Sequence, residues 1–234
     1  GNLFILFISI FMASRPDIHP LNDWIYFFQF FFYNIIFVLK EVILDWSRHS
    51  TNDTINNQTT RRGSKAKEGD IEENVKWHTL DVGDVIYLEK GEIVPADIVL
   101  LDTNDIMDKE MVCYIDLSLV QGFTPVIRKK ASFLTQFLQR SPAKQKWMEY
   151  RKILSGKLEY DPPNKNPNIF NGNLKLRKDP KMENLTIDNF IPRGAVIMHT
   201  GWIYGLVVYT GKDTKIYNNT DYGNLKLSFI EYMI

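Results

Sequence analysis

The feature that most constrains this chain is a dense apolar run near its start. Residues 24–44, with the sequence WIYFFQFFFYNIIFVLKEVIL, hold six phenylalanines and two tyrosines. About twenty mostly apolar residues form a helix long enough to cross the hydrocarbon core of a bilayer. Trp24 and Tyr26 stand at one end, where aromatic side chains mark the membrane interface. The alternative is a buried helix of a soluble protein, but no later segment is apolar enough to cover it. We therefore expect a membrane helix.

A shorter apolar run comes first. Residues 3–12 (LFILFISIFM) are followed by Arg15, Pro16 and Asp17, and about ten apolar residues are too few to cross a bilayer alone. We interpret them as the last part of an incomplete helix, so that residues 1–48 form a helical hairpin with a short outer loop at 17–23. Basic residues follow the second run, which indicates that its end faces the cytosol.

Two polar residues interrupt the second run, Gln29 and Asn34. Polar side chains at membrane depth can line the path of a lipid headgroup. They can equally join neighbouring helices by hydrogen bonds, which is the interpretation we favour.

The remaining sequence is typical of a cytosolic β-domain. Residues 49–76 are rich in Asn, Thr and charge and are expected to form a tether. Short apolar runs bounded by Gly, Pro and Asp then predict strands at 85–88, 98–101, 112–116, 194–198 and 204–209. Residues 133–154 have helical spacing, and 161–172 are expected to form a surface loop. The pattern predicts a mainly-β jelly-roll or distorted barrel with a helical insertion at residues 77–220, and 221–234 lead into a further segment.

Composition excludes several kinds of site. Lys plus Arg and Asp plus Glu both total 28, so there is no basic excess of the kind that binds nucleic acid. Cys113 is the single cysteine, which rules out an internal disulfide framework and the usual cysteine-rich zinc site. No phosphate-binding glycine-rich motif occurs. We therefore expect this chain to bind no metal or cofactor and to hold no complete active site.

Two adjacent segments carry a resemblance to a known family. Residues 77–86 (WHTLDVGDVI) and 92–101 (EIVPADIVLL) resemble the actuator domain of P-type ATPases. Further segments are similar to the P4 branch, the phospholipid flippases: 16–20 (PDIHP), 113–116 (CYID), 161–164 (DPPN), 170–172 (FNG), 188–194 (DNFIPRG) and 200–215 (TGWIYGLVVYTGKDTK). The resemblance covers nearly the whole chain in the order of the family.

The resemblance implies a fragment of a phospholipid-translocating ATPase. Its actuator domain would lie in the cytosol and couple the ATP-driven phosphorylation cycle to the membrane helices of an integral membrane protein. The parent protein would use ATP and magnesium, act on membrane lipids, and contact its own remaining ATPase domains and an accessory membrane subunit. Its phosphorylated aspartate would lie outside this chain.

One loop departs from the family pattern. Active members carry Asp-Gly-Glu-Thr there, and the resemblance implies that the glutamate positions the water that hydrolyses the aspartyl phosphate. Here the loop reads Gln121-Gly122-Phe123-Thr124, followed by Pro125. Phenylalanine cannot accept a proton, so no catalytic residue of the loop is intact. Asp116 is the alternative carboxylate, although it lies upstream of the loop.

Three hypotheses follow from this degenerate loop. Bifunctional guanylyl cyclases of apicomplexan and ciliate protists resemble flippases in their N-terminal half, and we favour a pseudoenzyme module of such a cGMP-synthesising protein. The alternatives are an active aminophospholipid flippase and a non-catalytic membrane scaffold.

Overall fold

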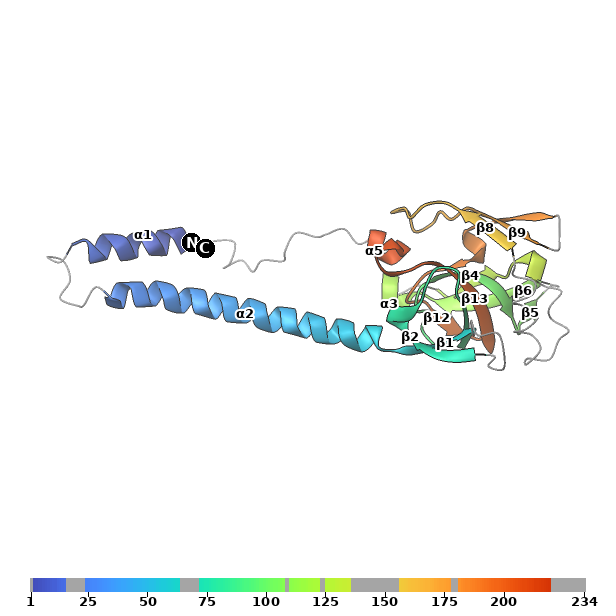
Figure 1. The fold of residues 1–234 in the computed structure, drawn as a ribbon, viewed down its shortest axis with the longest axis horizontal. Helices are drawn as coiled ribbons and strands as arrows, with labels where there is room; N and C mark the ends of the chain where they lie inside the picture. Colours follow the sequence, from blue (N-terminus) through green and yellow to red (C-terminus); the bar gives the residue numbers. More distant parts are fainter. Residues whose placement is uncertain are drawn as a thin grey trace. The chain divides into compact units, whose positions relative to one another are not determined.

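The computed structural model describes residues 2–15, 24–63, 72–107, 110–122, 125–135, 156–177 and 181–219. The chain divides into two compact units. One comprises Gly1–Ile55 with Tyr222–Ile234, and the other comprises Asn56–Asp221. All the strands lie in the second unit (Figure 1).

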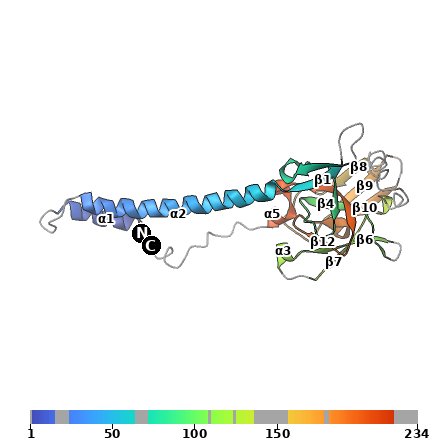
Figure 2. The ribbon, with the colours of Figure 1, turned by 90° about the horizontal axis from the view of Figure 1, so that it is seen from below.

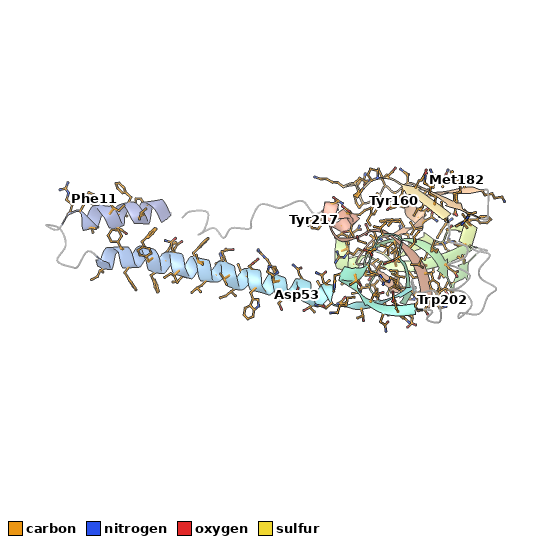
Figure 3. All side chains as sticks on the ribbon, viewed as in Figure 1. Phe11, Asp53, Tyr160, Met182, Trp202 and Tyr217 are labelled. Atoms are coloured by element: carbon orange, nitrogen blue, oxygen red, sulfur yellow. The ribbon has the colours of Figure 1, made fainter. Side chains whose placement is uncertain are left out.

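The first unit contains helices α1 (Asn2–Ala13) and α2 (Trp24–Asn56). Large apolar side chains project into solvent along both, and Phe28 and Ile43 of α2 are 66% and 62% exposed (Figure 3). Within the described part of the chain, no helix combines the length and the apolar character that a membrane crossing requires. The predicted membrane hairpin is therefore not confirmed, and its outer loop at 17–23 lies outside the described residues.

The described residues of the second unit form three antiparallel sheets, and Figure 2 shows their strands from a second direction. The largest has the strand order β11-β4-β13-β3-β1-β2, with β11 Phe190–Ile191, β4 Asp97–Thr103, β13 Trp202–Tyr209, β3 Val85–Glu89, β1 Thr59–Gly63 and β2 Glu72–Lys76. A second has the order β10-β9-β8, with β10 Met182–Leu185, β9 Gly172–Leu176 and β8 Gly156–Tyr160. In the third, β6 (Glu110–Asp116) pairs with β12, β5 and β7, which are Val196–Met198, Ile106–Met107 and Ile127–Lys130.

Short helical elements lie between these strands or follow the last of them. They are α3 (Ser118–Gln121), α5 (Lys215–Asn219) and the 3-10 helices η1 (Trp77–Thr79), η3 (Ile187–Asn189) and η4 (Gly211–Asp213).

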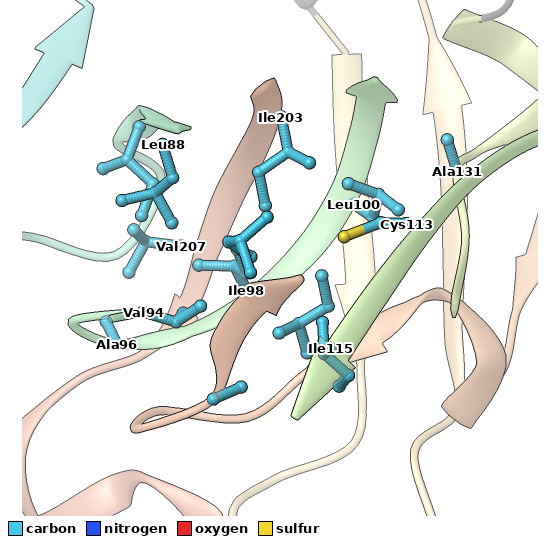
Figure 4. Packing of buried hydrophobic residues seen from close by; sticks show 14 of the residues in the cluster. Leu88, Val94, Ala96, Ile98, Leu100, Cys113, Ile115, Ala131, Ile203 and Val207 are labelled. Atoms are coloured by element: carbon cyan, nitrogen blue, oxygen red, sulfur yellow. The ribbon is translucent and has the colours of Figure 1, made fainter. Parts of the chain in front are cut away.

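The main core lies between the six-stranded sheet and the β6 sheet (Figure 4). Ile98 and Leu100 of β4 pack with Cys113 and Ile115 of β6, and all four are fully buried. Every residue of β4 is buried, which explains the near-continuous apolar run in its sequence. Burial of apolar area of this kind is the main favourable term in folding.

The predicted strands are confirmed as β3, β4, β6, β12 and β13, and so is the mainly-β character of this unit. Strands β8 to β10 were not predicted. Residues 133–135 form a short 3-10 turn, whereas the rest of the expected helical insertion, 136–154, lies outside the described residues, as does 220–234.

The segment expected to be a tether has a different structure where it is described. Helix α2 continues to Asn56, and residues 59–63 and 72–76 form β1 and β2. Some of the charged residues of this segment form ion pairs in the second unit. Arg62 of β1 contacts Glu73 of β2 at 2.5 Å and Asp84, which precedes β3, at 3.1 Å. Residues 64–71 lie outside the described part.

Candidate functional site

The first half of the predicted loop lies at the exposed end of α3. The backbone N–H of Gln121 donates to Leu117 O at 2.9 Å, and that of Gly122 donates to Ser118 O at 3.1 Å. Gly122 has φ 79° and ψ −153°, a conformation open to glycine but not to residues with a Cβ. Gln121 and Gly122 are both exposed, whereas Phe123 and Thr124 lie outside the described residues.

The carboxylate of Asp116 forms hydrogen bonds with Ser118, the first residue of α3. Its Oδ1 accepts the Ser118 backbone N–H at 2.8 Å, and its Oδ2 accepts the Ser118 hydroxyl at 2.7 Å. These two hydrogen bonds lower the pKa of Asp116. An anionic side chain bonded to the first backbone N–H groups of a helix stabilises its start. Asp116 therefore orients α3, and through it the chain that enters the loop.

Helix α3 packs against the turn that follows β11. Gly194 in this turn has φ +81°, and a Cβ at this position would lie 2.9 Å from Cγ2 of Val120. The backbone N–H of Gly194 donates to Val94 O at 2.8 Å. The glycine thus lets α3 approach the turn closely.

Asp97 joins three segments that sequence analysis singled out separately. It is fully buried at the start of β4, and its Oδ1 and Oδ2 accept the backbone N–H groups of Arg193 and Lys215, each at 2.7 Å. Burial raises the pKa of Asp97 to about 6, although the two hydrogen bonds act in the opposite direction. The aspartate of the VPAD sequence thus holds together the IPRG turn and the start of α5.

Gln29 and Asn34, the polar residues predicted at membrane depth, belong to the first unit, whereas the loop residues belong to the second. Asn34 Nδ2 donates to Phe30 O at 2.8 Å, a bond within its own helix. Gln29 belongs to α2, but its side chain is not among those described.

Within the described residues, no group of three or more His, Cys, Asp or Glu side chains is placed to hold a metal ion. The thiol of Cys113 is buried in the core, and burial raises its pKa to about 12. A thiol with this pKa is protonated at neutral pH and is a poor nucleophile.

Sequence analysis did not single out two buried lysines, Lys129 and Lys215, which are 7% and 2% exposed. A signal for the first was available. Residues 127–130 read IRKK, and alternation along a strand places Lys129 on the same face as Ile127.

Comparison with known proteins identifies relatives of the whole chain. Residues 57–113 match the family model of the P-type ATPase actuator domain. The chain is 30% identical over 98% of its length to guanylate cyclase alpha of Plasmodium falciparum, of which the match covers 5%. It is 32% identical over 84% of its length to the mouse phospholipid-transporting ATPase FetA, and 29% identical over its full length to the yeast phospholipid-transporting ATPase DRS2, covering 15% and 16% of those proteins. The chain thus spans a small part of the relatives that it matches.

Proposed function

Because the chain belongs to the P-type ATPase family, as an actuator domain of the phospholipid-transporting type, we propose that it is the regulatory actuator module of a larger membrane protein. In this proposal the domain moves with an ATP- and magnesium-dependent phosphorylation cycle of the parent. Its partners are membrane lipids, the parent's remaining ATPase domains and an accessory membrane subunit. The module has lost the ability to promote dephosphorylation.

The proposal rests on Phe123, which the resemblance places at the position of the glutamate in the family's Asp-Gly-Glu-Thr loop. A benzyl side chain can neither accept a proton from water nor hold the water in line. Asp116 is the nearest upstream carboxylate, but both of its oxygens are bonded to Ser118. Moving it to a water molecule would break two hydrogen bonds that organise α3.

The test is phosphoenzyme turnover by the purified full-length protein, with labelled ATP and a panel of phospholipids. We expect either no phosphoenzyme or one that persists, and we expect Phe123→Glu to shorten the lifetime of a persistent one. Leu119→Glu is the matched control, because it adds a carboxylate at a site on α3 that is 67% exposed. A lipid-stimulated phosphoenzyme that decays rapidly in the unmodified protein would support the alternative, an active aminophospholipid flippase.

The similarity to a Plasmodium guanylate cyclase favours a specific parent, a bifunctional cyclase that makes cGMP. The corresponding measurement is cGMP production from GTP by the full-length protein, with and without ATP. Cyclase activity that depends on the actuator would support a regulatory role. A parent with neither cyclase activity nor a phosphoenzyme would leave the third hypothesis, a membrane scaffold.

We also propose that α1 and α2 lie in lipid and that the second unit, Asn56–Asp221, lies in the cytosol. We call this second unit the β-unit. The support is the row of exposed apolar side chains along these helices, including Phe31, Ile35 and Val42 at 57%, 57% and 58% exposure. Apolar area of this extent in water is unfavourable at roughly 25 cal/mol per Å². Extraction of membranes with alkaline carbonate tests this, and release of the chain into the soluble fraction would contradict it.

A further inference from the structure

A cavity of about 200 Å³ lies behind α3 in the β-unit. Its walls come from α3, β7, η3, β11 and α5, together with the segment at 167–168. Apolar side chains line much of it, among them Val120, Ile127 and Ile216. The buried lysines Lys129 and Lys215 line it as well, which is unusual because lysine is almost never fully buried unless it is paired.

The ammonium group of Lys129 has one hydrogen-bond partner among the described residues. Its Nζ donates to Ile187 O at 2.8 Å, and Ile187 also lines the cavity. Burial lowers the pKa of Lys129, and the charge of Asp188 acts in the opposite direction. An ammonium group carries three N–H donors, so two of them have no protein acceptor in the described part of the chain.

Lys215 is held in a similar way by neutral acceptors. Its Nζ donates to Asn164 Oδ1 at 2.9 Å and to Asn166 O at 3.0 Å. It lies 5.8 Å from the ring centroid of Phe190, another residue of the cavity wall. Burial lowers its pKa, and the carboxylates of Asp97 and Asp161 raise it from a distance.

Two buried lysines thus line one small cavity, and neither ammonium group forms an ion pair with a described residue. A buried charge without a counter-ion is costly. Among the described residues, two N–H donors of Lys129 and one of Lys215 have no protein acceptor, and Asn168 and Asn219 line the same cavity. This donor set suits an anion with three oxygens, and the apolar wall suits a small apolar body.

We propose that this cavity binds a small soluble phosphate monoester, with the phosphate between Lys129 and Lys215 and an apolar substituent against Val120 and Ile216. In this proposal, ligand binding at the cavity does not require phosphorylation of the parent protein. Because Val120 and Gln121 lie in its wall, a bound ligand also fixes the end of α3 that leads into residues 123–124.

The experiment is calorimetric titration of the chain with phenyl phosphate. We expect saturable binding of one molecule per chain. Lys129→Met should weaken it about tenfold or more, since hydrogen bonds to a charged group contribute about 1.5–3 kcal/mol. Lys212→Met is the control, because Lys212 is exposed and three positions from Lys215. Its affinity should match that of the unmodified chain.

Two further measurements distinguish a specific loss of binding from a general loss of folding. Lys129→Arg keeps the charge and should retain most of the binding, and the melting temperature of each variant is recorded without ligand. Phenol, which lacks the phosphate, should not bind, and benzoate should bind more weakly than phenyl phosphate. Unchanged affinity in Lys129→Met, or equal affinity for phenol, would overturn the proposal and leave both lysines with a purely structural role.

Discussion

The Oδ2 atom of Asp97 accepts the backbone N–H of Lys215 at 2.7 Å across 118 positions of sequence. The same carboxylate accepts the backbone N–H of Arg193 through Oδ1. One buried side chain therefore fixes both the turn against which α3 packs and the start of the helix that bears Lys215. A change at Asp97 should reach the site through these two bonds.

The first prediction concerns Asp97→Asn. At pH 4 the folded Asp97 is protonated, and its hydroxyl oxygen can still accept a backbone N–H. The NH₂ group of an amide cannot accept, so in the variant one of the two backbone N–H groups loses its acceptor. A buried donor left unsatisfied costs about 1–3 kcal/mol, and we expect the free energy of unfolding at pH 4 to fall by about that amount. Urea denaturation measures it.

The difference between the unmodified chain and this variant should depend on pH. The pKa of Asp97 is about 6 in the folded chain and has an ordinary value of 3.8, so between these values the folded chain holds a proton that the unfolded chain has released. The stability due to this proton is complete below about pH 4 and is lost as the pH rises through about 6. The advantage of Asp97 over Asn should therefore shrink from pH 4 to pH 7. A constant difference would contradict the prediction.

The second prediction concerns the approach of α3 to the turn. Gly194→Ala places a Cβ 2.9 Å from Val120 Cγ2, at a φ of +81°. The backbone conformation alone costs roughly 1–2 kcal/mol for a residue with a Cβ, and the contact adds to it. Thermal unfolding of the variant measures the sum.

Gly91→Ala separates the two costs. Gly91 has φ +85°, but a Cβ there would meet nothing within 4 Å, so only the backbone cost remains. We expect Gly194→Ala to be the more destabilising, and Val120→Ala to recover part of the difference in the double variant. Equal losses at the two glycines would show that α3 does not press on the turn.

The third prediction concerns Glu183 of β10. Its carboxylate accepts the Ser132 hydroxyl and the backbone N–H groups of Phe133 and Leu134, at 2.5, 2.8 and 3.1 Å. Glu183→Gln replaces one accepting oxygen by an NH₂ group, and we expect it to cost about 1–3 kcal/mol in chemical denaturation. Glu159→Gln is the control, because Glu159 pairs with Lys157 at an exposed site, where an ion pair contributes little to stability. A loss no larger than that of the control would refute the role assigned to Glu183.

The central strands could be predicted because the apolar pattern of their own residues indicates that they are buried. Ile98 to Leu101 form a continuous apolar run between turn residues, and all of them are buried. Strand β9 carries an equally clear signal, since the buried residues Leu174 and Leu176 alternate with the exposed residues Asn173 and Lys175. The Pro- and Asn-rich stretch before it predicts a loop, and the period of two that follows is too short to stand out beside it.

The site was less accessible to sequence analysis. The loop position was found because its neighbours resemble a family, whereas the role of Asp116 depends on the backbone of Ser118 and could not be read from composition. The cavity could not be predicted at all. Lys129 and Lys215 are 86 positions apart in the sequence. They line the same cavity because β7 and α5 both contribute to its wall.

The last prediction tests the segment that sequence analysis treated as a tether. Arg62 has a side chain 14% exposed and pairs with Glu73 and with Asp84, whose side chain is 3% exposed. Removal of one partner of a buried ion pair costs about 3–5 kcal/mol, and we expect Arg62→Met to approach that range. The preceding Arg61 is the matched control, because its pairs with Glu89 and Glu92 are more exposed and should contribute at most about 1 kcal/mol.

Added salt should reduce the effect of Arg61→Met more than that of Arg62→Met, because exposed charges are screened more strongly. Equal losses for the two variants in urea denaturation would mean that β1 and β2 contribute little to the stability of the β-unit. A larger loss for Arg62→Met would show that the ion pairs joining β1 to β2 and to Asp84 contribute to the stability of the β-unit.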